Sequence, residues 1–187
     1  KKYTFKQLDQ TTKILLDITF AIQSPKVISL IEKITGIQNQ RPDASLYAGG
    51  LSLMTKNHFL NPHIDNSHDS DQKYYRTLNL LYYISPDWKL EYGGNLELWD
   101  NKVKKAIVIP STFNRFVIME TNLHSWHSVN PIKYIGNRCC VSNYYFSDHS
   151  PSNQEYFNVT SFSARPDQKI RRAISKVDNF LRNNIRL

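Results

Sequence analysis

The sequence predicts a protein of the α+β class that is mainly β, with short strands in a sandwich or barrel and helices at both ends of the chain. Residues 46–148 alternate short runs rich in Tyr, Ile, Leu and Val with turn signals such as a pair of glycines. Many short strands at this spacing are typical of β-sandwiches and barrels. Both ends of the chain instead repeat apolar residues at helical spacing. We therefore expect one domain over residues 1–187, with helical support at 1–40, the β core, and a last helix at 166–184.

The first 37 residues are expected to form two helices. A first helical stripe consists of Phe5, Leu8, Leu15, Ile18 and Ile22. Ser24 followed by Pro25 is a typical helix start, with an N-cap residue and proline at the first helical position. Gly36 fits a C-cap. A second helix is therefore expected between Ser24 and Gly36.

Strands are expected at residues 77–84, 95–99, 105–109, 115–119 and 138–146, each bounded by Gly, Pro, Asn or Ser.

The last helix is expected to begin at Pro166-Asp167. Its apolar stripe consists of Ile170, Ile174, Val177 and Leu181, with basic residues on the other faces. Helical amphipathicity usually marks a face that is buried on a core, so we expect this helix to pack on the sheet. A helix that lies on a membrane surface is the alternative.

Composition fits one globular domain. The hydrophobic fraction is 40% and the aromatic fraction 12%, so the 187 residues can form a core and are not a disordered chain. No run of about 18 apolar residues occurs, so we expect no membrane span, and no secretory leader pattern opens the chain, which begins Lys1-Lys2 without Met. Cys139 and Cys140 are adjacent and would point to opposite faces of a strand, which makes a poor disulfide and a poor metal pair. We therefore expect a reducing compartment, the cytoplasm.

The net charge of +8 favours acidic partners: nucleic acid, an anionic membrane surface, or a substrate with carboxylate or phosphate. A solvated, lysine-rich surface would carry the same charge and is the simpler interpretation. Part of the excess lies near the C-terminus, at Lys169, Arg171, Arg172, Lys176, Arg182 and Arg186.

The segment 61–66 is the first that could carry chemistry. On a strand, residues two apart project from the same face, so His63 and Asp65 can offer an imidazole and a carboxylate to one ion. His127, 62 residues after Asp65, can add a second imidazole, because several strands fit between them. Two histidines and one carboxylate form the facial triad of non-haem Fe(II) oxygenases, whereas a structural zinc site usually has a fourth protein ligand. A His-x-Asp pair taken alone is more often a hydrogen-bonded surface pair.

The other histidines compete as ligands; they are His58, His68, His124 and His149. His124 lies three residues before His127 and lacks the Val-x-Pro sequence that follows at 129–131. We therefore prefer His127.

Arg138 follows His127 by eleven residues and opens a predicted strand. A guanidinium group is a planar fork that can hold a carboxylate in two places. Next to a metal, it would suit a dicarboxylate co-substrate. The alternative is an edge-strand arginine in a surface ion pair.

Together these residues resemble the Fe(II)- and 2-oxoglutarate-dependent dioxygenases, in their prolyl 4-hydroxylase-like branch. The segment 76–84 is similar to the strand that follows the metal motif in that branch, and 86–98 to its loop and glycine-pair strand. The segment 127–131 is similar to its His-x-Val-x-Pro sequence, and 141–146 to its last core strand. The resemblance covers residues 46–148, a little over half of the chain.

The resemblance implies a double-stranded β-helix, or jelly roll, in which His63, Asp65 and His127 hold Fe(II). It also implies 2-oxoglutarate and O₂ as co-substrates, with ascorbate as a candidate reductant. The far carboxylate of 2-oxoglutarate would pair with Arg138.

Tyr83 matches a position whose phenol helps to bind that carboxylate, although it could equally be a core tyrosine. Asn79 and Leu81 share its strand face and should line the same pocket. The interval between His127 and Arg138 is slightly longer than in animal prolyl hydroxylases. The match of Arg138 to the family's arginine is therefore weaker than that of the metal ligands.

The resemblance further implies hydroxylation of an aliphatic C–H bond, with release of succinate and CO₂, and a prolyl residue of a protein or peptide as the substrate. A small, acidic metabolite or a free amino acid is the alternative. Nucleic acid is not expected, because relatives that demethylate it have a second arginine soon after the first, and the strand after Arg138 has none. A jelly-roll binding module with a vestigial metal site and a cupin-type isomerase remain as other classes. The segments 66–75 and 147–165 are expected to border the substrate entrance.

Overall fold

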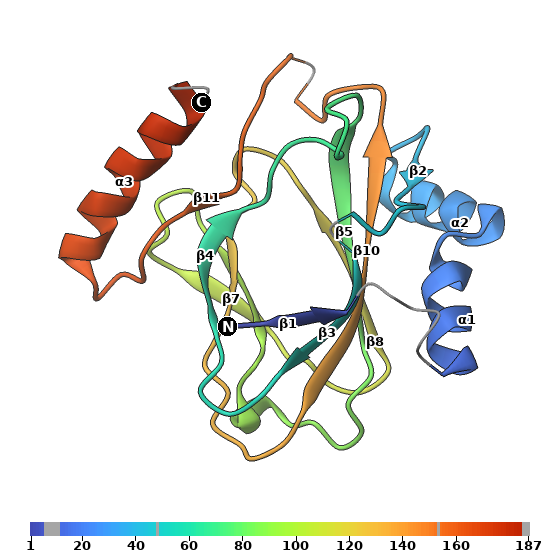
Figure 1. Ribbon diagram of the computed structural model, residues 1–187, viewed down its shortest axis with the longest axis horizontal. Helices are drawn as coiled ribbons and strands as arrows, with labels where there is room; N and C mark the ends of the chain where they lie inside the picture. The colour runs from blue at the N-terminus through green and yellow to red at the C-terminus, as the bar shows by residue number, and fades with distance from the viewer. Residues whose placement is uncertain (6–11, 48, 153, 185–187) are drawn as a thin grey trace.

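The computed structural model describes residues 1–5, 12–47, 49–152 and 154–184, in which two antiparallel sheets face each other (Figure 1). The first sheet contains β1 (Tyr3–Phe5), β2 (Arg41–Pro42), β3 (Gly50–Met54), β5 (Tyr75–Tyr83), β8 (Arg115–Glu120) and β10 (Arg138–Ser147). The second contains β4 (Leu60–Ile64), β6 (Leu96–Trp99), β7 (Ala106–Ile109), β9 (His127–Val129) and β11 (Ser161–Phe162). The orders are β1-β3-β10-β5-β8, with β2 paired to β10, and β11-β4-β9-β6-β7. From β3 to β11 the chain alternates between the two sheets, except at the β6–β7 pair, as in the jelly roll. The predicted fold class is therefore confirmed.

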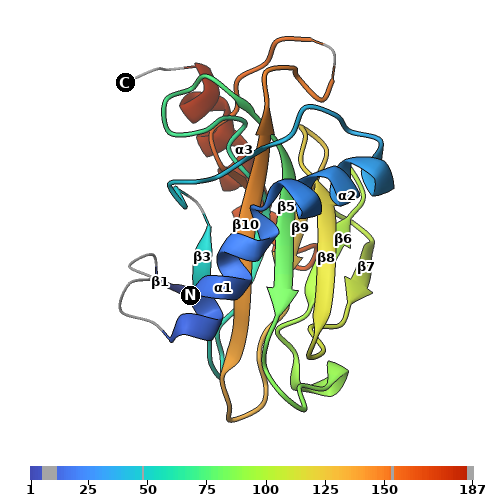
Figure 2. The same ribbon diagram turned by 90° about the vertical axis from the view of Figure 1, so that its right-hand side faces the viewer.

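Two helices cover the outer face of the first sheet: α1 (Lys13–Ile22) and α2 (Pro25–Thr35) lie across β10, β5 and β8 (Figure 2). They form one buried cluster with that sheet, made of Ile22, Ile31, Leu78, Leu80, Val141 and Tyr145. Because side chains alternate along a strand, Leu78 and Leu80 face the helices. Asn79 and Tyr83 of β5 are therefore turned toward the space between the sheets.

A second buried cluster joins the two sheets. It consists of Met54, Trp88, Val129 and Ile132. The Trp88 indole donates a hydrogen bond to the carbonyl of Gly93, 2.9 Å away, near the short 3₁₀ helix η2 (Leu90–Tyr92). Trp88 is thus a packing residue.

The predicted boundaries of the second helix are confirmed. Ser24 is the N-cap and its hydroxyl accepts from the Val27 amide at 3.4 Å, while Gly36 is the C-cap with φ of 75°. The prediction for the first helix was too long, because Phe5 lies in β1, which pairs with the edge of β3. Leu8 lies outside the described residues.

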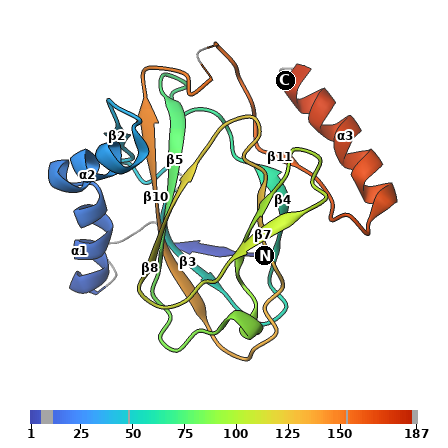
Figure 3. The ribbon, with the colours of Figure 1, turned by 180° about the vertical axis from the view of Figure 1, so that it is seen from behind.

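The last helix forms, as α3 (Lys169–Asn184), on the outer side of the second sheet (Figure 3). The prediction that its apolar stripe packs on the sheet is wrong. Ile170, Ile174, Val177 and Leu181 are all exposed, and polar side chains hold the helix to the body. Arg186 lies outside the described residues.

Among the described helices, none is long and apolar enough by itself to cross a membrane. Only α1 and α2 taken together reach the required length and composition, with a 48° bend between them.

Candidate metal centre

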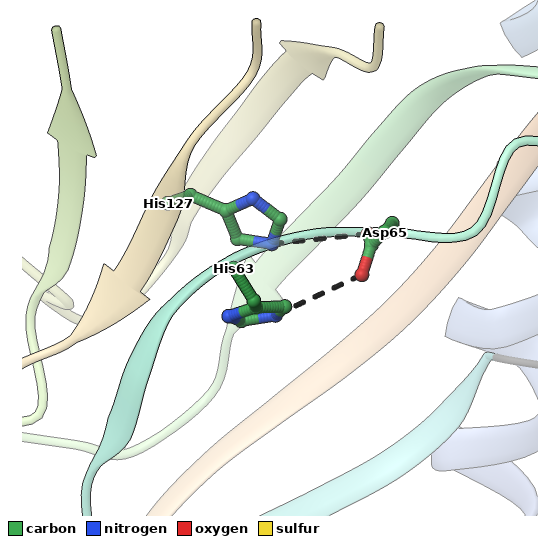
Figure 4. Close-up of side chains that lie close together, drawn as sticks. All are labelled: His63, Asp65 and His127. Carbon is green, nitrogen blue, oxygen red and sulfur yellow. Dashed lines mark ion pairs between the residues drawn. The ribbon is translucent and has the colours of Figure 1, made fainter. Parts of the chain in front are cut away.

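Three metal-binding side chains meet between the sheets. His63 lies near the end of β4, Asp65 directly follows that strand, and His127 opens β9. The ladder between β4 and β9 places His63 opposite His127. Figure 4 shows both imidazoles directed toward the Asp65 carboxylate, with Nε2 of His63 3.7 Å and Nε2 of His127 3.8 Å from its oxygens. One ligand atom from each residue lies within 4.8 Å of the others. The nitrogen–oxygen distances of 3.7 and 3.8 Å are short enough for one ion with bonds of about 2 Å to contact both atoms.

Backbone carbonyls orient both imidazoles. Nδ1 of His63 is 2.8 Å from the carbonyl oxygen of Asn61, and Nδ1 of His127 is 2.9 Å from that of Ser125. In each ring, Nδ1–H therefore donates to the backbone and the lone pair of Nε2 is directed to the centre. Burial, together with the neighbouring His127, lowers the pKa of His63 to about 4, so this imidazole is neutral at pH 7, as a metal ligand must be.

Asp65 is held by charged and polar neighbours. Burial acts to raise the pKa of its carboxyl, but electrostatic interactions with His127, Arg76, His63 and Lys2 together outweigh burial, and the pKa is lowered. Nη1 of Arg76 lies 3.6 Å from Oδ2 of Asp65, and the amide of Asn79 donates to the same oxygen at 3.4 Å. The Arg76 guanidinium is fully buried and lies over the Tyr144 ring, 4.1 Å from its centroid. Asp65 is therefore an oriented carboxylate at pH 7.

Arg138 and Tyr83 form a second polar group beside the centre. The Arg138 guanidinium lies over the Tyr83 ring, 4.7 Å from its centroid, and its Nη2 is 3.4 Å from the hydroxyl of Ser111. Both side chains are buried, and burial raises the pKa of the Tyr83 phenol to about 12. Nε of Arg138 and the hydroxyl of Tyr83 have no hydrogen-bond partner among the described residues. Two buried donors without acceptors fit a carboxylate ligand, because leaving such groups unpaired is costly.

A cavity of about 70 Å³ connects the two groups. Its lining includes His63, Asp65, His127, Arg138, Asn79 and Leu81. The structure thus brings the three metal ligands together with Arg138 and Asn79 around one cavity. Tyr83 is not part of that lining, and its ring packs against the Arg138 guanidinium. Asn79 donates a hydrogen bond to Asp65.

The competing histidines lie elsewhere. His124 and His149 are exposed. His58 accepts from the Thr55 amide at 3.2 Å, and His68 lies 2.7 Å from the Ser67 hydroxyl. Within the described part of the chain, the group with metal-ligand geometry is His63, Asp65 and His127.

Sequence reasoning missed three neighbours of the centre. Lys2 lines the cavity, Arg76 contacts Asp65, and the Phe162 ring stacks on His63 with centroids 5.5 Å apart. The strand pairings β1–β3 and β11–β4 bring Lys2 and Phe162 to the centre, and both pairings join distant parts of the chain. A single arginine in the apolar strand β5 was the one signal that could have drawn attention to Arg76.

The two segments expected at the substrate entrance line one pocket. Its volume is about 390 Å³, and it contains His68 and Asp69 from the first segment and Asn158 and Phe162 from the second. Because Phe162 also contacts His63, this pocket lies next to the metal centre.

Comparison with known proteins agrees with this geometry. The model of the 2OG-Fe(II) oxygenase superfamily matches residues 49–146. A prolyl 4-hydroxylase from Phytophthora capsici has a similar fold, with a TM-score of 0.57 and 14% identity over 95% of this chain and 57% of that chain. HygX from Streptomyces hygroscopicus, solved with nickel, 2-oxoglutarate and hygromycin B, gives a TM-score of 0.50 and 12% identity, covering 89% of this chain and 80% of that chain.

The chain thus spans a little over half the length of the Phytophthora protein. At sequence identities of 14% and 12%, these structural similarities show a shared fold and nothing about the substrate. No curated protein matches the chain by sequence.

Proposed function

This chain belongs to the 2OG-Fe(II) oxygenase superfamily, and we propose that it hydroxylates an aliphatic C–H bond of a prolyl residue in a protein or peptide. The observation that carries the activity is the placement of two unpaired buried donors, on Arg138 and Tyr83, beside a triad of His63, Asp65 and His127. A metal site alone would fit many functions. A metal site next to a buried carboxylate receptor fits a dicarboxylate co-substrate.

The donor set fits Fe(II). Nε2 of His63, the Asp65 carboxylate and Nε2 of His127 would hold the ion on one side and leave its other positions for ligands. When bound, Fe(II) with 2-oxoglutarate and O₂ supplies the oxidising chemistry: the co-substrate is converted to succinate and CO₂, and one oxygen atom enters the substrate C–H bond. Ascorbate is the proposed reductant for iron that becomes oxidised.

The remaining residues of the site would bind 2-oxoglutarate and orient the metal ligands. Arg138 would hold the far carboxylate of 2-oxoglutarate by charge, while the neutral Tyr83 phenol would donate a hydrogen bond to it. Arg76 and Asn79 keep the Asp65 carboxylate directed at the ion. Leu81, Leu96 and Val129 supply apolar walls of the cavity, which limit the access of water.

The proposal of a prolyl substrate is supported by the sequence resemblance and by the fold shared with the Phytophthora prolyl 4-hydroxylase. The alternative is a small metabolite or a free amino acid. It is favoured by the comparable likeness to HygX, which was solved with the small molecule hygromycin B.

An anaerobic titration tests the site. Fe(II) and 2-oxoglutarate are added to the metal-free protein, and the visible charge-transfer absorption of the chelate is recorded. We expect a band that disappears in Asp65→Ala, weakens in Arg138→Ala and is unchanged in the control His124→Ala. No band at saturating iron would contradict the proposal and favour a binding module with a vestigial metal site.

A turnover assay then separates the two substrate classes. Succinate formation is measured with proline-containing peptides and, separately, with free amino acids and small carboxylic acids. Stimulation by the peptides, with gain of one oxygen atom on proline by mass spectrometry, is the expected result. Stimulation by the small molecules alone would replace the prolyl proposal with the alternative.

A further inference from the structure

The helix α3 is attached to the body through its polar side. The Arg172 guanidinium donates to the carbonyl oxygens of Val103 and Lys102, at 2.8 and 2.7 Å. Two turns later, the Asn179 amide donates to the Phe162 carbonyl at 2.7 Å, and the Phe162 amide donates back to Asn179 at 3.0 Å. These anchors define which side of the helix faces the protein.

The apolar stripe of α3 faces the opposite way. Ile174 and Val177 are each two residues from one of the anchors, and two residues turn a helix by about 200°. Their exposed fractions are 63% and 61%, and those of Ile170 and Leu181 are 80% and 45%. A large amphipathic character is usually a sign of burial on the core, but here the polar side is turned inward and the apolar side outward.

Basic side chains border the outward stripe. The helix contains five basic residues and one acidic residue, Asp178, which pairs with Arg182 at 2.8 Å. Lys169 and Arg171 are exposed beside Ile170. The turn that Arg172 holds adds three further exposed lysines, Lys102, Lys104 and Lys105. Asp100 in that turn and Asp167 before the helix are also exposed, but together with Asp178 they are outnumbered by the exposed basic residues around the stripe.

We propose that the outward face of α3 docks this domain on an anionic lipid surface. The four apolar side chains would enter the boundary between headgroups and acyl chains, and the exposed Lys169, Arg171 and lysines of the neighbouring turn would contact lipid phosphates and carboxylates. A narrow apolar stripe bordered by Lys and Arg, on a helix that is otherwise polar, is the pattern of helices that lie in the membrane plane.

Charge argues against a second copy of this chain as the occupant. Pairing two such helices stripe to stripe would bring two sets of basic residues together, with Asp178 as the one acidic residue of each helix. An anionic bilayer supplies the complementary charge. The inference does not depend on the proposed oxygenase activity.

Vesicle flotation with the whole protein tests the proposal. Vesicles of phosphatidylcholine alone are compared with vesicles containing about one-third phosphatidylserine, at low and high salt. We expect binding to the anionic vesicles that weakens as salt rises, because salt screens the headgroup charge. Ile174→Glu combined with Val177→Glu should reduce the bound fraction at least tenfold, and Lys169→Glu combined with Arg171→Glu should remove the preference for anionic lipid.

Ile14→Glu is the matched control. Ile14 is also an exposed apolar residue on a helix, with 65% exposed, but α1 lies on the opposite side of the molecule (Figure 1). This variant should float like the wild type, and circular dichroism should verify that all variants are folded.

Two outcomes would overturn the proposal. One is a folded wild type that does not float, or floats equally well after Ile174→Glu and Val177→Glu. The other is a dimer in analytical ultracentrifugation that these substitutions dissociate, without vesicle binding, which would make the face an interface between copies of the chain.

Discussion

His63 and His127 lie directly opposite each other across the ladder between β4 and β9, with ring centroids 4.2 Å apart. Because backbone pairing sets this distance, and backbone carbonyls fix both rings, the two Nε2 atoms are preorganised toward Asp65. The centre therefore requires little rearrangement to accept an ion.

Loss of one imidazole should abolish tight metal binding. We expect His127→Ala to lower the affinity for Fe(II) by more than about 100-fold, since removing even an outer partner of a metal ligand costs about 10–100-fold. Anaerobic calorimetric titration measures this effect. His124→Ala, three residues away and exposed, should bind iron like the wild type; similar losses in both variants would contradict the assignment.

The receptor formed by Arg138 and Tyr83 should determine the affinity for 2-oxoglutarate and leave the affinity for iron unchanged. Arg138→Ala removes a buried cation and should weaken 2-oxoglutarate binding by on the order of 2–5 kcal/mol. Tyr83→Phe removes one neutral donor and should cost about 1 kcal/mol. The charge-transfer band gives both affinities, with the iron affinity measured separately.

Tyr82→Phe is the control for Tyr83→Phe. The Tyr82 hydroxyl donates to Asn114 at 2.6 Å in an exposed pair, although the two tyrosines are adjacent in β5. If Tyr82→Phe weakened 2-oxoglutarate binding as much as Tyr83→Phe, the role proposed for Tyr83 would be wrong.

Arg76 should contribute to stability as well as to the site. Arg76→Met leaves Asp65 with fewer positive neighbours in a buried position, and we expect the free energy of unfolding to fall by about 3 kcal/mol. Urea unfolding of the metal-free protein checks this value. Arg41→Met is the comparison, because Arg41 makes an exposed pair with Asp148 at 2.8 Å, which is worth at most about 1 kcal/mol. Equal losses in the two variants would show that burial of Arg76 is unimportant.

Local patterns predicted much of this molecule. The cap residues Ser24 and Gly36 depend on neighbouring backbone alone, and the alternation along β5 separates Leu80 from Asn79 by strand geometry alone. The spacing of His63 and Asp65 likewise fixes a shared face. These features were predicted because their physical cause lies within a few residues of sequence.

Features that depend on distant pairing were missed. Phe5 has helical spacing with its neighbours, but the open edge of β3 offers hydrogen bonds that draw it into β1. Amphipathicity revealed the stripe on α3 but not its direction, which is decided by the anchors Arg172 and Asn179. The contact between Arg76 and Asp65 also crosses between elements, so no local pattern contained it.

Gly93 packs directly against the backbone of Pro131, and we expect that any side chain at this position destabilises the fold. Its φ is 76°, and a Cβ atom at this position would lie 2.0 Å from the carbonyl oxygen of Pro131. Gly36 has nearly the same φ, 75°, but open space around it. Gly36→Ala should therefore cost only the backbone strain, about 1–2 kcal/mol.

Gly93→Ala should lower the free energy of unfolding clearly more than Gly36→Ala does, because the loop at Pro131 must also move. That loop continues into Ile132, whose side chain packs against Gly94 beside the Arg138 side chain. We therefore expect Gly93→Ala to weaken 2-oxoglutarate binding in the fraction that folds, while Gly36→Ala leaves it unchanged. Urea unfolding and the charge-transfer titration measure the two effects, and equal behaviour of the variants would refute the steric argument.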